Sequence, residues 1–239
     1  MNKISELSKK DLLSIRIVLD RSGSMSGSQK VTMEALNTYL KGLKKEKGIN
    51  ASLTLSTFDS ISIDIPISRV SLKTLKSFPA DLLKPRGGTP LFDAIGLAIH
   101  DLENVIETSD DDKVLVIVTD GLENASKEYT FENISSKIKE KEEAGWLIIY
   151  LGADHDTFKQ SNSLNFNQER SMKYSKKDSV DTFRAVTRTT LDYSKGMKSK
   201  DIKFTEQERI YSDKPSVDKF EDYFQADAHV KAYRKLKEE

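Results

Sequence analysis

The sequence contains no cysteine, which excludes disulfide bonds, thiolate metal sites and cysteine nucleophiles. It also has no apolar run near the roughly 20 residues that a membrane-spanning helix needs. The longest such run, residues 114–118, is typical of a buried strand. Residues 1–11 mix charged and isolated apolar residues and lack the apolar centre of a secretory signal. We therefore expect a cytoplasmic protein that does not contact a membrane.

An excess of one charge is also missing. Lys and Arg number 38, Asp and Glu number 38, and the formal net charge is zero. No global positive field is available to attract nucleic acid, so we expect no nucleic-acid partner. With 37% hydrophobic and 32% charged residues, the composition is that of a folded chain rather than a disordered one. A length of 239 residues favours one domain with an appendage.

Strand and helix patterns alternate along most of the chain. Residues 12–19 predict a strand that runs into a Ser/Gly-rich loop, and apolar residues at helical spacing follow from 31 to 43. Residues 51–58 and 60–67 predict an antiparallel hairpin with Pro66 at a sheet edge. Helices are predicted from Pro90 to 106, from a Thr130 cap to 144, at 156–161 and at 179–193, and further strands at 114–118, 146–151 and 172–174.

This order predicts an α/β fold in three layers, αβα, with a mostly parallel, Rossmann-like sheet of six strands and one antiparallel edge strand. The character changes at residue 196. Residues 196–239 contain ten Lys or Arg and ten Asp or Glu with few aliphatic residues, and we interpret them as a charged helical C-terminal extension. Its apolar stripe either packs on the domain's own surface or serves a partner or a second copy; the stripe consists of Val217, Phe220, Tyr223 and Phe224.

The segment Asp-Arg-Ser-Gly-Ser at positions 20–24 follows the first predicted strand directly. In an open α/β sheet, ligands bind at the carboxyl ends of the strands. The carboxylate of Asp20 and the hydroxyls of Ser22 and Ser24 occupy alternate positions, so a tight loop can turn three oxygen atoms towards one point. Hard oxygen ligands of this kind select Mg²⁺, Mn²⁺ or Ca²⁺.

This motif resembles the metal-ion-dependent adhesion site of the von Willebrand factor type A (VWA) family. The resemblance implies a further ligand from a threonine before a helix, which Gly-Gly-Thr-Pro at 87–90 supplies, and an aspartate after the fourth strand, which Thr-Asp-Gly at 119–121 supplies. The implied metal ligands are Asp20, Ser22, Ser24, Thr89 and Asp120. The resemblance to the VWA family covers roughly residues 10–195. We therefore place a VWA domain at residues 12–195, after an N-terminal lead at residues 1–11.

The resemblance also implies a function. In this family the aspartates act partly through bound water, and the metal keeps an open coordination position that a partner's carboxylate can complete. We therefore predict a non-enzymatic, cation-dependent protein-binding module that uses Mg²⁺, or alternatively Mn²⁺ or Ca²⁺, to capture a Glu or Asp of a partner protein. Domains of this kind without a fused module resemble those of bacteria and phages.

Two alternatives stay open. In the first, the chain is a self-assembling scaffold, and residues 196–239 of one copy supply the carboxylate to the metal of the next. In the second, it is a metal-dependent hydrolase, although only His100, His155 and His229 are available for proton transfer near neutral pH. Further acidic residues are expected to be solvated loop charges, with Glu123 the best candidate for the metal rim; they are Asp59, Asp64, Asp93, Glu123 and Asp154. Residues 110–112 are expected to cap the turn before Lys113.

Overall fold

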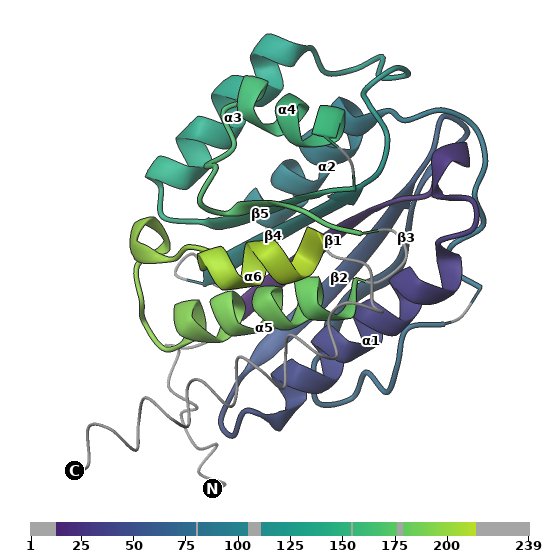
Figure 1. Ribbon diagram of the computed structural model, residues 1–239. Helices are drawn as coiled ribbons and strands as arrows, with labels where there is room; N and C mark the ends of the chain where they lie inside the picture. Colours follow the sequence, from purple (N-terminus) through teal and green to yellow (C-terminus); the bar gives the residue numbers. More distant parts are fainter. Residues whose placement is uncertain (1–12, 80, 105–110, 154, 176–178, 214–239) are drawn as a thin grey trace, which may run out of the picture.

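The computed structural model describes residues 13–79, 81–104, 111–153, 155–175 and 179–213 (Figure 1). Its six-stranded sheet has the order β3-β2-β1-β4-β5-β6, and β3 alone runs antiparallel to its neighbour. The strands are β1 (Leu13–Asp20), β2 (Ala51–Phe58), β3 (Ile63–Ser71), β4 (Asp112–Thr119), β5 (Leu147–Gly152) and β6 (Ser171–Lys173). The predicted α/β sheet with one antiparallel edge is confirmed.

Helices cover both faces of this sheet (Figure 1). They are α1 (Gln29–Lys45), α2 (Leu91–Glu103), α3 (Phe131–Glu143), α4 (His155–Ser163), α5 (Val180–Ser194) and α6 (Glu206–Asp213), with short 3₁₀ turns at Gly23–Met25 and Ser199–Asp201. One hydrophobic cluster joins the sheet to α1 and α5, and a second joins it to α2 and α3. Every residue of the central strand β1 is buried, because helices pack on both of its faces. None of the described helices is long and apolar enough to cross a bilayer.

The β2–β3 hairpin differs in one detail from the expected one. β3 begins at Ile63, three residues later than predicted. The carboxylate of Asp59 accepts hydrogen bonds from the backbone N–H groups of Ile61 (2.7 Å) and Ser62 (3.1 Å). This side chain closes a longer turn of the type that aspartate favours. Pro66 lies in the edge strand as predicted, where its missing N–H is tolerated.

The helix starts follow the sequence signals closely. Thr130 caps α3, and its hydroxyl accepts a hydrogen bond from the N–H of Asn133 at 3.3 Å, as predicted. α2 begins at Leu91, so Pro90 precedes the first helical residue instead of occupying it.

The first part of the charged extension packs on the domain. Ile202 and Phe204 belong to the larger hydrophobic cluster. Arg188 of α5 binds the Glu208 carboxylate of α6 with bonds of 2.6 and 2.8 Å. The predicted apolar stripe at positions 217–224 lies outside the described residues.

Candidate metal centre

The five predicted ligands come from three segments that meet at one edge of the sheet. β1 and β4 are parallel neighbours, with Leu19 opposite Val118, so the loops after them begin side by side. The Gly-Gly-Thr-Pro loop before α2 joins them, because the N–H of Gly23 donates to the carbonyl of Gly87 at 3.0 Å. The topology therefore places all three segments at the carboxyl edge, where open α/β sheets bind ligands.

Hydrogen bonds link three of the five side chains to one another, and a fourth, Asp20, accepts from the backbone of Ser22. The hydroxyl oxygens of Ser22 and Ser24 lie 2.8 Å apart. Ser24 Oγ donates to Asp120 Oδ1 at 2.5 Å, and Asp20 Oδ1 accepts from the N–H of Ser22 at 2.7 Å. Their oxygen atoms thus face one another across a short distance.

Gly121 locates the space between these oxygens and Thr89. A Cβ atom on Gly121 would lie 2.6 Å from Thr89 Oγ1, 3.3 Å from Ser24 Oγ and 3.5 Å from Asp20 Oδ2. A single point beside Gly121, on the third segment, therefore lies close to oxygens from the other two segments. The residue that keeps this space open is a glycine, which has no side chain to fill it.

The chemistry of the donors fits a hard dication. The five predicted ligands supply three hydroxyls and two carboxylates, and oxygen ligands of these kinds suit Mg²⁺, Mn²⁺ and Ca²⁺. Across the described ranges, no group of three or more His, Cys, Asp or Glu residues could hold a metal ion. A metal here would depend on the hydroxyls as well as on Asp20 and Asp120, and the ligand roles stay a prediction.

Electrostatics make the space favourable for positive charge. Asp20 is fully buried, and this burial raises its pKa to about 6, against the opposing hydrogen bonds from Thr119 and Ser22. The nearby carboxylate of Asp120 raises the pKa of Asp20 further by like-charge repulsion. A dication between the two carboxylates would offset both the cost of burying the Asp20 charge and its repulsion by Asp120.

Thr119 is a positioning residue that the sequence reasoning missed. Its hydroxyl donates to Asp20 Oδ2 at 2.6 Å and accepts from the N–H of Gly121 at 3.1 Å. It thereby fixes the Asp20 carboxylate and the open backbone at Gly121 together. The sequence contains a signal for this role, because Thr119 is the last residue of a buried strand and directly precedes Asp120.

The expectation that Asp59 is a solvated loop charge is wrong. Its side chain is fully buried and accepts hydrogen bonds from Arg21 Nε at 2.7 Å and Arg86 Nε at 2.9 Å. Burial alone would raise the pKa of Asp59, but bonds from Arg86, the turn backbone and Arg21 together hold its pKa below the usual value. Arg21 also pairs with the exposed Asp64 at 2.8 Å. Because Arg21 lies between Asp20 and Ser22, this network anchors the loop that carries the first three predicted ligands.

Two other acidic candidates hold loops together. The Glu123 carboxylate accepts hydrogen bonds from the N–H groups of Ala125, Ser126 and Phe92, so it joins the loop after β4 to the first turn of α2. The Asp93 carboxylate accepts from three consecutive N–H groups at residues 127–129. The expectation that Glu123 and Asp93 are solvated charges is therefore wrong. Their carboxylate oxygens accept hydrogen bonds from loop N–H groups, which need a partner where the loop is part-buried. Asp154 lies outside the described residues.

Asn124 fixes the Thr89 loop. Its Oδ1 accepts from the N–H of Thr89 at 2.8 Å, and its own N–H donates to the carbonyl of Thr89 at 3.1 Å. Asn124→Ala removes the side-chain bond and is expected to lower the free energy of unfolding by about 1 kcal/mol. Urea unfolding measures this, with the exposed Lys127→Ala as the matched control. An Asn124→Ala protein as stable as the control would contradict the anchoring role.

Among the side chains that the structure describes, no histidine lies at the oxygen cluster to transfer a proton. His100 is exposed in the last turn of α2, where Asn104 contacts its ring, while the cluster lies before the first turn. His155 starts α4, and neither its side chain nor His229 is among the described parts of the structure.

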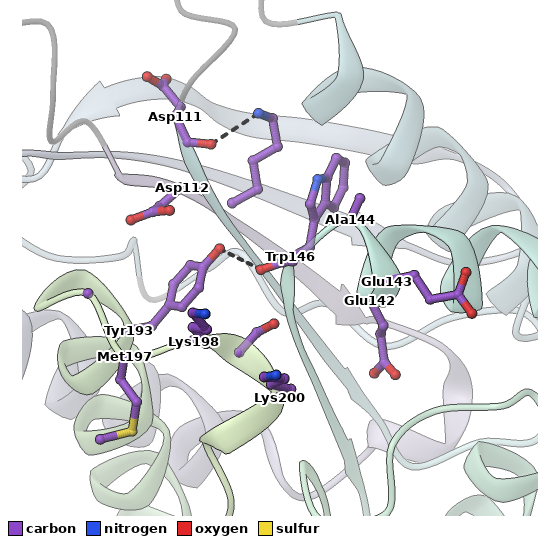
Figure 2. A pocket seen from close by; sticks show the side chains of 14 residues that line it. Asp111, Asp112, Glu142, Glu143, Ala144, Trp146, Tyr193, Met197, Lys198 and Lys200 are labelled. Atoms are coloured by element: carbon purple, nitrogen blue, oxygen red, sulfur yellow. Dashed lines mark hydrogen bonds between the residues drawn. The ribbon is translucent and has the colours of Figure 1, made fainter.

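A basin of about 570 Å³ lies at the opposite end of the sheet, at the amino ends of β4 and β5 (Figure 2). Tyr193 donates its hydroxyl proton to the carbonyl of Gly145 at 2.8 Å on its floor. Acidic and basic side chains both surround the basin, so it does not select one ligand charge; they are Asp111, Asp112, Glu142, Glu143, Lys113, Lys198 and Lys200. The carbonyl of Asp111 accepts a bond from Lys113 Nζ, and position 110 of the expected turn cap lies outside the described residues.

Comparison with solved structures shows the same fold in other proteins. The chain is similar to the vWF domain of the type V pili tip protein Mfa5 from Porphyromonas gingivalis, with a TM-score of 0.59 and 10% identity over 80% of this chain and 99% of that one. A von Willebrand factor type A structure from Catenulispora acidiphila gives a TM-score of 0.55 at 15% identity, over 76% of this chain and 43% of that one. The pilus adhesin SpaC from Lactobacillus rhamnosus GG, in an open conformation, gives 0.53 at 16% identity, over 79% of this chain and 31% of that one.

At these identities the similarity shows the fold alone, and this chain spans less than half of the second and third structures. Curated protein sequences give no match. The sequence profile of the von Willebrand factor type A domain matches residues 13–159, which is more than half of the chain and includes the three loops of the oxygen cluster. The chain therefore belongs to the von Willebrand factor type A domain family.

Proposed function

We propose that this protein is a divalent-cation-dependent protein-binding module. Its metal, held by Asp20, Ser22, Ser24, Thr89 and Asp120, captures an acidic residue of a partner protein. The observation that carries the proposal is the position beside Gly121, where one point lies within 3.5 Å of oxygens of Asp20, Ser24 and Thr89, while Ser24 Oγ also bonds to Asp120 Oδ1. Family membership supports the same conclusion.

The charge of the donor set explains why such a metal would attract an anion. Three neutral hydroxyls and two carboxylates can at most neutralise a dication. A ligand shell completed by a partner's carboxylate gains a charge-assisted bond that water does not provide. The N-terminus of α2 begins two residues after Thr89, and its positive dipole end favours an anionic ligand in the same place.

The surface around the Thr89 loop favours a protein over a small anion. Ser60 holds this loop on one side through bonds to Gly88, and Asn124 holds it on the other. Next to these anchors, Ile61 is 67% exposed and Leu122 is 47% exposed. Exposed aliphatic side chains such as these can supply apolar contacts to a bound protein. Two of the similar structures are pilus proteins, a tip protein and an adhesin, and we extend an adhesive role to this chain only as part of the proposal.

The test combines metal binding with capture of a partner. The full chain, immobilised with Mg²⁺, is expected to retain a partner from native extract, and EDTA or the Asp120→Ala substitution is expected to abolish the retention. Titration calorimetry with Mg²⁺ and Mn²⁺ should show binding to the wild-type protein and at least tenfold weaker binding to Asp120→Ala. The control is Lys127→Ala, an exposed change on the same loop.

Retention that persists in EDTA would contradict the proposal, as would equal metal affinity in the wild-type and Asp120→Ala proteins. Capture of a second copy of the chain itself, detected as a metal-dependent rise in mass in solution, would instead support the self-assembling scaffold.

A further inference from the structure

The charged residues that line a groove between α1 and α5 are all basic. The groove measures about 590 Å³ and lies on the face of the sheet where these two helices run side by side (Figure 1). Five of its eight lining residues are basic and none is acidic; they are Thr38, Lys41, Gly42, Lys44, Lys45, Lys76, Arg184 and Thr187. The protein as a whole has zero net charge, so this groove is a local concentration of cations.

The two helices approach closely along the floor of the groove. A Cβ atom on Gly42 would lie 2.6 Å from the methyl group of Thr187, so the glycine is needed for this packing. The lysine side chains stand around this narrow floor and can cover apolar surface with their stems while their ammonium groups face outward. The groove can therefore accept a segment that combines carboxylates with apolar side chains.

Few of these cations are neutralised within the described structure. Arg184 pairs with Asp181 at 2.6 Å, and Lys44 donates to the carbonyl of Leu75 at 2.9 Å. In the described part of the chain, Lys41, Lys45 and Lys76 form no ion pair with an acidic side chain. Each of these three side chains is exposed.

The chain itself contains a segment of matching chemistry. Residues 216–228 contain the acids Asp218, Glu221, Asp222 and Asp227 and one base, Lys219, which gives a net charge of −3. Three aromatic residues are interspersed with these acids at positions 220, 223 and 224. This combination of carboxylates and apolar rings suits a groove lined by lysines, whose stems can pack on the rings.

The described chain ends with α6, which packs against α5, one wall of the groove. The N–H of Ser175 donates to the carbonyl of Ser212 at 2.8 Å, and only residues 176–178 separate Ser175 from Ser179, the cap of α5. Arg184, which lines the groove, lies in the second turn of α5. α6 packs on α5 through the Arg188–Glu208 bonds, and the groove lies on the α1 side of α5. The five residues from Asp213 to Asp218 can span about 17 Å, more than the 8 to 10 Å between packed helices.

We propose that the acidic segment 216–228 of this chain docks in the basic groove between α1 and α5. A tethered segment has an effective concentration that a free acidic partner rarely reaches, which favours this occupant over another protein. The docking needs no metal, so it stands independently of the proposed function.

The absence of native cysteine permits a clean cross-linking test on the full chain. The neutral positions Thr38, in the groove, and Gln225, in the segment, are changed to cysteine, so that all charges are kept. A short bismaleimide is expected to join them within one molecule at least tenfold faster than it joins Ser136→Cys and Gln225→Cys. Ser136 is an exposed residue of α3, on the other face of the sheet.

Charge reversal then tests the chemistry of the contact. Lys41→Glu with Lys45→Glu is expected to lower the cross-linking rate at least fivefold, as is about 1 M NaCl, where the Debye length is about 3 Å. Adding Asp218→Lys and Asp222→Lys to the reversed groove should restore the rate. Urea unfolding checks that these exposed changes leave the domain folded.

The proposal is overturned by equal rates for the groove and α3 positions, or by a rate that charge reversal leaves unchanged. Cross-links that form between two molecules rather than within one would also overturn it, because the occupant would then be a second copy.

Discussion

Asp20→Asn is expected to make the metal-free protein more stable at about pH 7.5, by about 3 kcal/mol. The reason is that the wild-type carboxylate is fully buried, which destabilises its charged form and raises its pKa to about 6. A shift of about two units from the ordinary value of 3.8 corresponds to about 3 kcal/mol. Asparagine removes the charge and keeps a carbonyl oxygen to accept the bond from the N–H of Ser22, while its amide nitrogen replaces Oδ2 and the Thr119 hydroxyl must turn to accept from it.

The pH dependence has a definite sign. Below about pH 4 the Asp20 carboxyl is protonated in both the folded and the unfolded state, so wild type and variant should be equally stable. Between about pH 4 and 6 the folded state binds the proton that the unfolded state releases, and the free energy of unfolding of wild type falls as pH rises. The stability advantage of Asp20→Asn should therefore grow from near zero at about pH 4 to its full size above the pKa of Asp20.

Urea unfolding in EDTA at several pH values measures this difference. The matched control is Asp64→Asn, because hydrogen bonds from Arg21 lower the pKa of the exposed Asp64, so this change should be neutral or mildly destabilising. With saturating Mg²⁺ the order should reverse, since only wild type gains binding energy. An Asp20→Asn protein less stable than wild type in EDTA at about pH 7.5 would contradict the assignment of Asp20 as a strained, buried charge.

Gly121→Ala is expected to weaken Mg²⁺ binding by about 100-fold, which is about 2.7 kcal/mol. The added methyl group would lie 2.6 Å from Thr89 Oγ1, closer than real side chains approach. Either the methyl fills the space between the oxygens, or the Thr89 hydroxyl rotates away and leaves the cluster. The backbone of Gly121 is outside the left-handed region, so alanine adds no backbone strain, and the cost of crowding is about 1 to 3 kcal/mol of stability.

Gly23→Ala is the matched control for this substitution. It adds the same methyl group to the Asp-Arg-Ser-Gly-Ser loop, but the nearest atom, the carbonyl oxygen of Gly87, is 3.4 Å away. Calorimetry should show Mg²⁺ affinity within a few-fold of wild type for Gly23→Ala and a large loss for Gly121→Ala. Equal affinity in the two variants would mean that the metal does not occupy the space beside Gly121.

The sequence alone determined the α/β fold and the family. The spacing of apolar residues that predicts a strand or a helix is a local property of the sequence. The apolar runs of β1 and β4 predict strands covered on both faces, and helices do cover both faces of these strands. The loops after the first and fourth strands could be placed at one edge because parallel strands share their carboxyl ends. Asp20 and Asp120 were therefore predictable as neighbours without coordinates, whereas Thr89 was placed beside them by the family resemblance alone.

Only the tertiary structure decided what the other charged side chains do. Asp59 is fully buried because Arg21 and Arg86, distant in sequence, both bind it, and no local pattern distinguishes such an aspartate from a solvated one. Glu123 and Asp93 became loop anchors for the same reason: their partners are backbone N–H groups of other segments. The space beside Gly121 and the basic groove over Gly42 likewise depend on how separate elements approach one another, which side-chain spacing along one chain does not encode.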